Sequence, residues 1–168
     1  YKNLSLPFNI NDQKNPINPY AITKLDDEKL AIKYAKIGVR VIGLRYFNVF
    51  GEKQSSTYAG VIKKFVKKVR NNEAPVINGD GQQTRDFVYV GDVVNANILA
   101  MNSNVNHEFF NIGTATTITI LELANLIIKS FNLSLKPIHG PELPGDVKIT
   151  KADISQVQKM LKWEPKIR

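Results

Sequence analysis

The sequence predicts an α/β fold built on a partial parallel sheet. Two observations lead to this prediction. Residues 19–37 have helical periodicity, and residues 39–44 directly after them are apolar and β-branched, as in a buried strand. Helical and strand patterns then alternate over the rest of the chain. This alternation favours parallel strands covered by helices.

The first helix has clear limits. Asn18 is a residue type that caps free backbone amides, and Pro19 suits the first helical position. Gly38 fits a C-terminal cap. The strand of residues 39–44 is expected to continue to Val49. Residues 1–18 read as a loop, and the helix has an apolar stripe formed by Leu30, Ala31, Tyr34 and Ala35.

Shorter elements follow. The patterns predict a helix over 60–71, strands at 75–77 and 86–90, a helix over 93–102 capped by Asp92, and a strand at 108–112. Thr119 and Glu122 form a capping box for a helix that ends near Phe131. Asp153 offers a cap for a last helix ending near Leu161. These strands are too few for a complete doubly wound sheet, so we expect half of a parallel Rossmann-like sheet with a small α/β subdomain.

Composition limits the class of protein. The 168 residues suffice for one ordinary domain, and 43% hydrophobic with 23% charged residues is typical of a globular protein. No apolar run approaches the roughly 18 residues of a membrane span. The absence of Cys excludes disulfides, zinc–thiolate sites and thiol nucleophiles. We expect no membrane partner, no metal site and a cytoplasmic location.

The formal charge of +8 raises two possible kinds of partner. Nucleic acid is one, and an anionic small molecule is the other. The cations are not gathered in a tail, and many lie on one predicted helix as Lys63, Lys64, Lys67, Lys68 and Arg70. A solvated basic face explains them best, so we expect no nucleic-acid partner.

Tyr20 and Lys24 are the most informative pair in the chain. Residues four apart on a helix lie on one face, so the Lys24 ammonium can sit beside the Tyr20 phenol. An adjacent cation favours phenolate over phenol. The spacing therefore predicts a general base that works near neutral pH.

Several ordered motifs resemble the NAD-dependent epimerase/dehydratase family of extended short-chain dehydrogenases/reductases, and most of all its UDP-glucose 4-epimerases. The resemblance covers nearly the whole chain as the C-terminal portion of such a protein. The motifs are Asn18-Pro19-Tyr20-Ala21 with Lys24, residues 44–51, Tyr58-Ala59-Gly60-Val61-Ile62, residues 78–87, Asn111-Ile112-Gly113, Gly145-Asp146-Val147 and Ala152-Asp153-Ile154-Ser155.

The resemblance implies a function. NAD would be the cofactor, a UDP-sugar the substrate, and interconversion of UDP-glucose and UDP-galactose the reaction. Tyr20 would take the proton of the sugar hydroxyl, while Lys24 would bind the nicotinamide ribose and activate Tyr20. A hydride would pass from the sugar C4 to NAD⁺ and return to the other face of the 4-keto sugar. The full-length protein would be a homodimer.

The resemblance also implies binding residues. Tyr46, Phe47 and Val49 would line the nicotinamide pocket together with Tyr20 and Lys24. Substrate would be bound by Asn48, Gly60, Val61, Val76, Asn78, Arg85 and Asp146. Arg85 is the strongest of these, because a guanidinium can hold a phosphate through two hydrogen bonds. A salt bridge from Arg85 to Asp86 or Asp92 is the alternative.

The sequence departs from the family in three ways. Leu143 stands where family members usually have a diphosphate-binding Arg, and Lys136 and Lys148 are candidate replacements. No Gly-x-x-Gly-x-x-Gly segment occurs, so a phosphate-binding turn for NAD is missing. The family's catalytic Ser/Thr would lie upstream of Tyr1. We therefore expect a fragment that neither holds NAD nor turns over substrate unaided.

The resemblance implies four regions. Residues 1–52 would complete an NAD-binding domain, 53–90 would form a substrate-binding subdomain, 91–114 would return to the first domain, and 115–168 would form a C-terminal substrate-binding subdomain. Two other functions stay open: a nucleotide-sugar 4,6-dehydratase or related enzyme, and a non-catalytic module that binds a nucleotide sugar.

Overall fold

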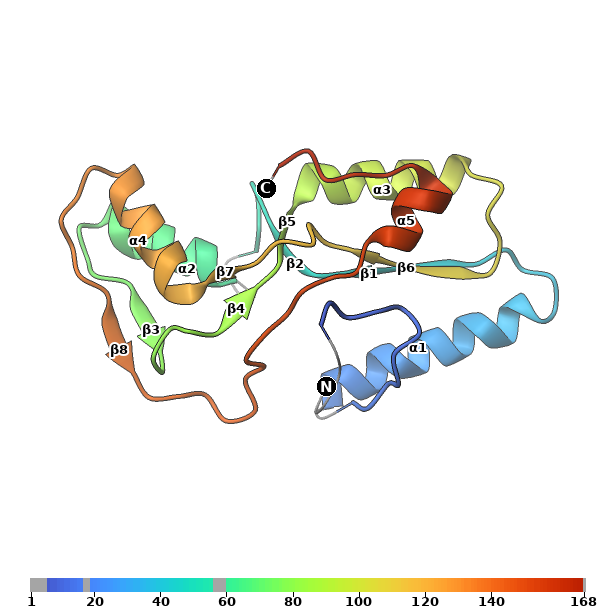
Figure 1. Ribbon diagram of the computed structural model, residues 1–168, viewed down its shortest axis with the longest axis horizontal. Coiled ribbons are helices and arrows are strands. Elements are labelled where there is room, and N and C mark those ends of the chain that lie inside the picture. Colours follow the sequence, from blue (N-terminus) through green and yellow to red (C-terminus); the bar gives the residue numbers. More distant parts are fainter. Residues whose placement is uncertain (1–5, 17–18, 56–59, 168) are drawn as a thin grey trace.

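The computed structural model describes residues 6–16, 19–55 and 60–167. Two lobes lie side by side along the long axis of the molecule (Figure 1). The first lobe contains α1 (Pro19–Ala35), β1 (Ile42–Tyr46), α3 (Val90–Asn102), β6 (Glu108–Ile112) and α5 (Ser155–Leu161). The second contains α2 (Val61–Arg70), β3 (Val76–Asn78), α4 (Ile120–Ser130) and β8 (Ile138–Gly140). Short strands join them: β2 (Asn48–Phe50), β4 (Thr84–Arg85), β5 (Phe87–Tyr89) and β7 (Ile118–Thr119).

Parallel pairing dominates, and it confirms the predicted α/β class. Strand β1 runs parallel to β6, β2 to β5, and β3 to β8, while β4 and β7 are antiparallel. The chain changes its pairing partner at Phe47. The Phe47 N–H donates to the Ile112 carbonyl at 2.9 Å, and the Asn48 N–H donates to the Asp86 carbonyl at 3.1 Å. One extended segment thus runs from the first lobe into the junction.

Each lobe has its own apolar core. The first core includes residues of β5, β6, α3 and the C-terminal segment, with Phe110 and Trp163 as its largest buried side chains. The second core joins α2, β3 and α4 through Phe65, Val69 and Ile77. Helix α5 therefore packs with α3 and β6, although it follows α4 in sequence.

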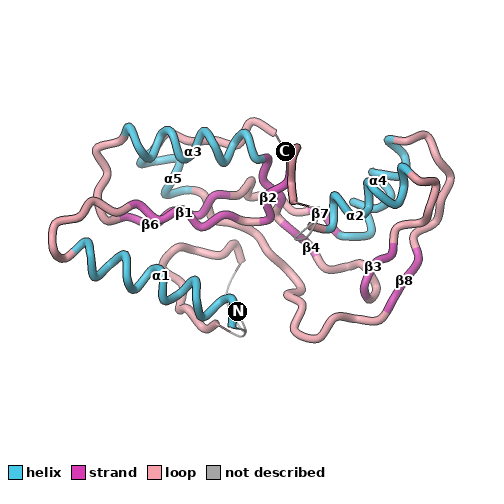
Figure 2. Tube along the Cα trace, turned by 180° about the vertical axis from the view of Figure 1, so that it is seen from behind, coloured by secondary structure: helices cyan, strands magenta, loops and turns pink. Residues whose placement is uncertain are grey.

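Helix α1 covers one face of the β1–β6 pair, while α3 and α5 cover the other (Figures 1 and 2). None of the α1 residues is buried. Its half-buried residues are Ala21, Leu25, Glu28, Ala31 and Ala35. The predicted apolar stripe is wrong for Leu30 and Tyr34, which are 53% and 48% exposed, because the described part of the chain places no element over that side of the helix.

One edge of β1 has no partner strand among the residues that the structure describes. Within the described ranges, β1 pairs with β6 alone. Backbone groups on the other edge of a strand in a two-stranded sheet are available for a further strand.

No helix among the described residues has both the length and the apolarity to cross a membrane.

Of the helix caps predicted from the sequence, the one for α4 is present and the one for α5 is shifted. The capping box of α4 is confirmed, since the Glu122 N–H donates to Thr119 Oγ1 at 3.0 Å and the Thr119 N–H donates to Glu122 Oε2 at 2.9 Å. The cap assigned to Asp153 is wrong by one residue. Ile154 occupies the N-cap of α5, and Asp153 instead accepts hydrogen bonds from the Ser155 N–H and the Asn9 side chain.

The helix cap predicted at Asp92 is also wrong. Helix α3 starts at Val90, so Asp92 lies within its first turn and is buried. Its carboxylate accepts the Ile167 N–H at 3.1 Å, and its carbonyl accepts the Trp163 indole N–H at 3.0 Å. Asp92 therefore connects α3 to the C-terminal segment, a long-range role that a local capping rule does not detect.

Candidate active site

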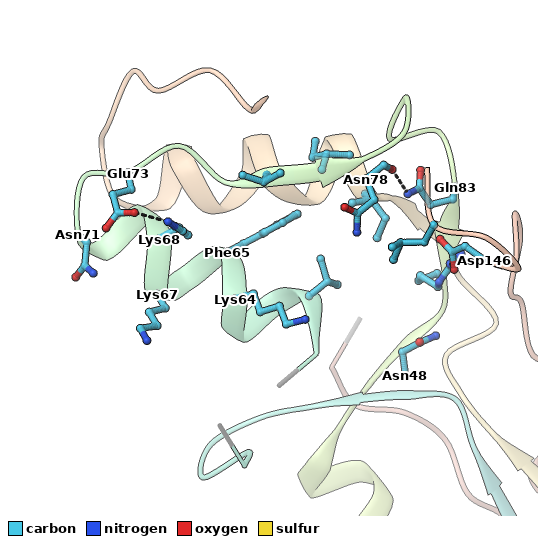
Figure 3. Close-up of a pocket in the computed structure, with 16 residues that line it drawn as sticks. Asn48, Lys64, Phe65, Lys67, Lys68, Asn71, Glu73, Asn78, Gln83 and Asp146 are labelled. Atoms are coloured by element: carbon cyan, nitrogen blue, oxygen red, sulfur yellow. Dashed lines mark hydrogen bonds and ion pairs between the residues drawn. The ribbon is translucent and has the colours of Figure 1, made fainter. Parts of the chain in front are cut away.

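The predicted site residues line two cavities. We call the first the α1 cavity; it measures about 880 Å³ and is lined by Tyr20, Lys24, Tyr46, Phe47 and Val49, among others. The second, the α2 cavity, measures about 790 Å³ and is lined by Asn48, Val61, Val76, Asn78, Arg85 and Asp146, among others (Figure 3). All the proposed catalytic and cofactor residues thus line one cavity, and the proposed substrate residues line the other except for Gly60.

The two cavities adjoin at two points of the chain. Phe47 and Val49 line the α1 cavity, whereas Asn48 between them lines the α2 cavity. Successive side chains of an extended segment point to opposite sides, which explains this division. The same change of side occurs between Asp146 and Val147. A molecule that extends past these residues can reach both cavities.

Tyr20 and Lys24 lie together at the start of α1. The Lys24 Nζ is 5.8 Å from the centroid of the Tyr20 ring, and the ring is 72% exposed. Lys24 also donates a hydrogen bond to Asp27 Oδ2 at 2.7 Å. This hydrogen bond, together with the negative charge of Asp27, raises the pKa of Lys24 above its ordinary value. Asp27 was not predicted, although its position three residues after Lys24 is a detectable signal.

Glu28 lines the same cavity. It accepts hydrogen bonds from two nitrogens of Arg45, at 2.6 and 2.9 Å, and pairs with Lys14 at 2.5 Å. Burial alone would raise the pKa of Glu28, but the hydrogen bonds from Arg45 and Lys14 outweigh burial and lower it. The cluster joins the N-terminal loop, α1 and β1.

The rest of the α1 cavity is largely apolar. The Tyr46 hydroxyl donates to Asn97 Oδ1 on α3 at 3.0 Å, which holds its ring at the end of β1. Gly43 leaves room for Phe109, because a Cβ at Gly43 would lie only 2.2 Å from that ring. Aromatic and aliphatic side chains thus line this cavity beside the cations Lys14, Lys24 and Arg45. A group of three potential metal ligands does not occur within the described residues.

Arg85 and Asn48 both line the α2 cavity. Arg85 Nη2 donates to Asp146 Oδ1 at 2.5 Å, and Arg85 Nη1 donates to the Thr84 carbonyl at 2.8 Å. The predicted alternative pairing of Arg85 with Asp86 or Asp92 is therefore wrong. Asp86 is fully buried, and its carboxylate is occupied by four hydrogen bonds from the backbone amides of Thr114, Ala115 and Ala152 and the Thr114 hydroxyl.

Asn48 is held in the same region. Its side-chain amide donates to the Asp86 carbonyl at 2.9 Å and approaches Thr150 Oγ1 at 3.4 Å. Both contacts orient the amide at the point where the two cavities meet. One amide hydrogen is therefore committed to the protein, and the Thr150 contact is long enough to be exchanged for a ligand oxygen.

Strand β3 and helix α2 supply further lining residues of the α2 cavity. Asn78 accepts a hydrogen bond on its carbonyl from Gln83 at 2.8 Å (Figure 3), and Val76 is 47% exposed. Gly60 is the N-cap of α2 and has no capping side chain, so the first amides of the helix have no side-chain acceptor from the cap. Leu143 lines the cavity as well. Asn18, Tyr58 and Ala59 of the predicted motifs lie outside the described residues.

Comparison with known proteins identifies the class. The sequence profile of the NAD dependent epimerase/dehydratase family matches residues 4–113. The chain belongs to this family, and its predicted membership is confirmed.

Individual relatives are nucleotide-sugar enzymes. The chain is 35% identical over 159 residues to a UDP-N-acetyl-alpha-D-glucosaminuronate decarboxylase of Bacillus cytotoxicus, covering 88% of this chain and 48% of that protein. It is 32% identical over 171 residues to a UDP-glucuronate 4-epimerase of Thermodesulfobacterium geofontis, covering 99% and 52%. The chain spans about half the length of the curated relatives it matches.

Solved structures agree with the fold. A UDP-glucose 4-epimerase of Thermotoga maritima, solved with UDP-glucose, is 37% identical with a TM-score of 0.88, covering 92% of this chain and 50% of that one. A UDP-glucuronic acid 4-epimerase of Bacillus cereus, solved with UDP-glucuronic acid and NAD, is 30% identical with a TM-score of 0.92, covering 100% and 54%.

Proposed function

We propose that this chain is the substrate-binding half of an NAD-dependent nucleotide-sugar 4-epimerase that interconverts UDP-glucose and UDP-galactose. One observation carries the proposal: the residues predicted for the redox step line the α1 cavity, and those predicted for the nucleotide, except Gly60, line the adjoining α2 cavity. A UDP-sugar that extends past Asn48 would place its sugar near Tyr20 and its nucleotide in the α2 cavity.

The residues of the α1 cavity would handle the proton and the sugar. Tyr20 would accept the proton of the C4 hydroxyl, and its exposed ring at the cavity leaves that hydroxyl accessible. Lys24 would donate to ribose hydroxyls of the cofactor, and Tyr46, Phe47 and Val49 would pack against the nicotinamide. NAD held by these residues would supply the hydride acceptor for oxidation at C4 and the hydride donor for the return step.

The residues of the α2 cavity would hold the nucleotide. Arg85 and Asn48 would donate to the diphosphate, and Asp146 would accept from a ribose or sugar hydroxyl. The start of α2 at Gly60 and Val61 would add backbone amides that have no side-chain acceptor from the cap residue. Val76 and Asn78 would cover the uracil. The open edge of β1 and the unburied α1 support the expectation that further sheet and cofactor-binding elements are needed for turnover.

The test is an assay of the complete gene product with added NAD. UDP-glucose, UDP-galactose and UDP-glucuronate are incubated separately, and the products are separated by chromatography. We expect the C4 epimer of UDP-glucose or UDP-galactose. Release of CO₂ from UDP-glucuronate without epimer formation would instead favour a decarboxylase, the activity named for one relative. UDP-sugar binding without any turnover would favour the non-catalytic module.

A further inference from the structure

Only some of the charged side chains that line the α2 cavity form ion pairs. Four cations and two carboxylates line it, an excess of two positive charges. Arg85 pairs with Asp146 at 2.5 Å, and the Arg85 side chain is only 13% exposed. Lys68 pairs with Glu73. Two cations remain, Lys64 and Lys67, and neither makes an ion pair with any described residue.

The two remaining lysines differ in direction. Both lie on α2, and both are exposed. In Figure 3 the Lys64 amine extends toward the end of the cavity where Asn48 and Asp146 lie, whereas the Lys67 amine points away from that end. Of the two cations without an ion pair among the described residues, Lys64 is therefore the one directed toward Asn48 and Asp146.

Near Arg85 and Asp146, little positive charge is left to bind an anionic ligand. Asp146 already offsets much of the charge of Arg85, and Leu143, which also lines the cavity, contributes none. The diphosphate of a nucleotide sugar carries two negative charges. Lys136 and Lys148, the replacements suggested by the sequence, do not line this cavity.

We propose that Lys64 is a substrate-binding residue that contacts the diphosphate of the nucleotide sugar together with Arg85. The proposal rests on the proposed function, because it assumes that the α2 cavity holds the nucleotide. Lys64 acts as a flexible point charge, whereas Arg85 provides a planar fork. The two would approach the phosphates from different walls of the cavity.

Calorimetric titration of the protein with UDP and with uridine tests the proposal, using Lys64→Gln with Lys67→Gln as the matched control. Each variant loses one charge from the same helix. We expect Lys64→Gln to weaken UDP binding about tenfold, the lower end of the range for a charge-assisted hydrogen bond. Uridine binding should be unchanged by Lys64→Gln, Lys67→Gln should bind UDP as the wild type does, and Lys64→Arg should restore most of the affinity.

The outcomes separate the two proposals. Wild-type protein that binds no UDP would overturn the nucleotide assignment of the cavity, and the role of Lys64 with it. Wild-type binding with equal losses for Lys64→Gln and Lys67→Gln would leave the proposed function standing but reduce Lys64 to part of a diffuse basic surface. Equal loss of UDP and uridine binding would show that Lys64 supports the pocket and does not recognise phosphate.

Discussion

Glu28 and Arg45 join α1 to β1 through two hydrogen bonds to the same carboxylate, at 2.6 and 2.9 Å. Their side chains are only 17% and 24% exposed. The pair lies on the wall of the α1 cavity and attaches α1, none of whose residues is buried, to the sheet.

Glu28→Gln is expected to destabilise the protein by about 2 kcal/mol, because it leaves the half-buried Arg45 without its negative partner. Urea unfolding measures the change. The matched control is Asp26→Asn on the same helix, since the Asp26–Lys29 pair is well exposed at 59% and 65% and should contribute at most about 0.5 kcal/mol. Equal losses for both variants would contradict a special role of Glu28.

The same pair predicts a pH dependence. The pKa of Glu28 is lowered in the folded protein, so its stabilisation is present above the ordinary carboxyl pKa and is lost as the pH falls through the folded value. The stability difference between the wild type and Glu28→Gln should be largest near neutral pH and should shrink in acid. A difference that stays constant from pH 7 to pH 3 would exclude this linkage.

Tyr20→Phe is expected to lower kcat of the complete enzyme by about 10²–10⁴-fold, the usual contribution of a general base. The fold should be unaffected, because the side chain is 72% exposed. Turnover and thermal unfolding are measured in parallel. Tyr34→Phe is the control, because Tyr34 lies on the same helix outside the α1 cavity. Near-normal turnover by Tyr20→Phe would refute the mechanism.

Arg85→Ala is expected to weaken UDP-sugar binding at least about tenfold while leaving NAD binding nearly unchanged, because charge-assisted bidentate contacts are strong. Separate titrations with each ligand test this. Arg70→Ala serves as the control, since Arg70 lies in the last turn of α2 and does not line the cavity. Equal losses for the two ligands would argue for a general structural effect.

Asp27→Asn is expected to lower the pKa of Lys24, because the hydrogen bond to Asp27 is the largest cause of its raised value. The Lys24 ammonium would then lose its proton at a lower pH than in the wild type. Titration of the lysine side chains by NMR follows this change. Asp26→Asn, which removes the partner of Lys29, should leave the Lys24 titration in place. An unchanged Lys24 titration in Asp27→Asn would show that the contact is not formed in solution.

Local features of this protein were predictable from the sequence alone. Three such features depend on residues within a few positions of one another. They are the bounds of β6, the capping box of α4 and the proximity of Tyr20 and Lys24. Propensity, capping and helical periodicity act over this range. The alternation of helical and strand patterns extended these predictions to the α/β class, and the family motifs extended them to the residues that line the two cavities. Their roles in binding and catalysis stay predictions.

Tertiary structure decided the contacts between distant residues. Arg85 pairs with Asp146, 61 positions away, and not with its neighbour Asp86, because burial and four hydrogen bonds already satisfy the Asp86 carboxylate. Only the fold directs Lys64 toward the cavity in place of Lys136 or Lys148. The sequence by itself thus determined which groups are present and how their local segments are shaped. The packing of the two lobes decided which of these groups meet, since ion pairing and burial depend on distance in space and not along the chain.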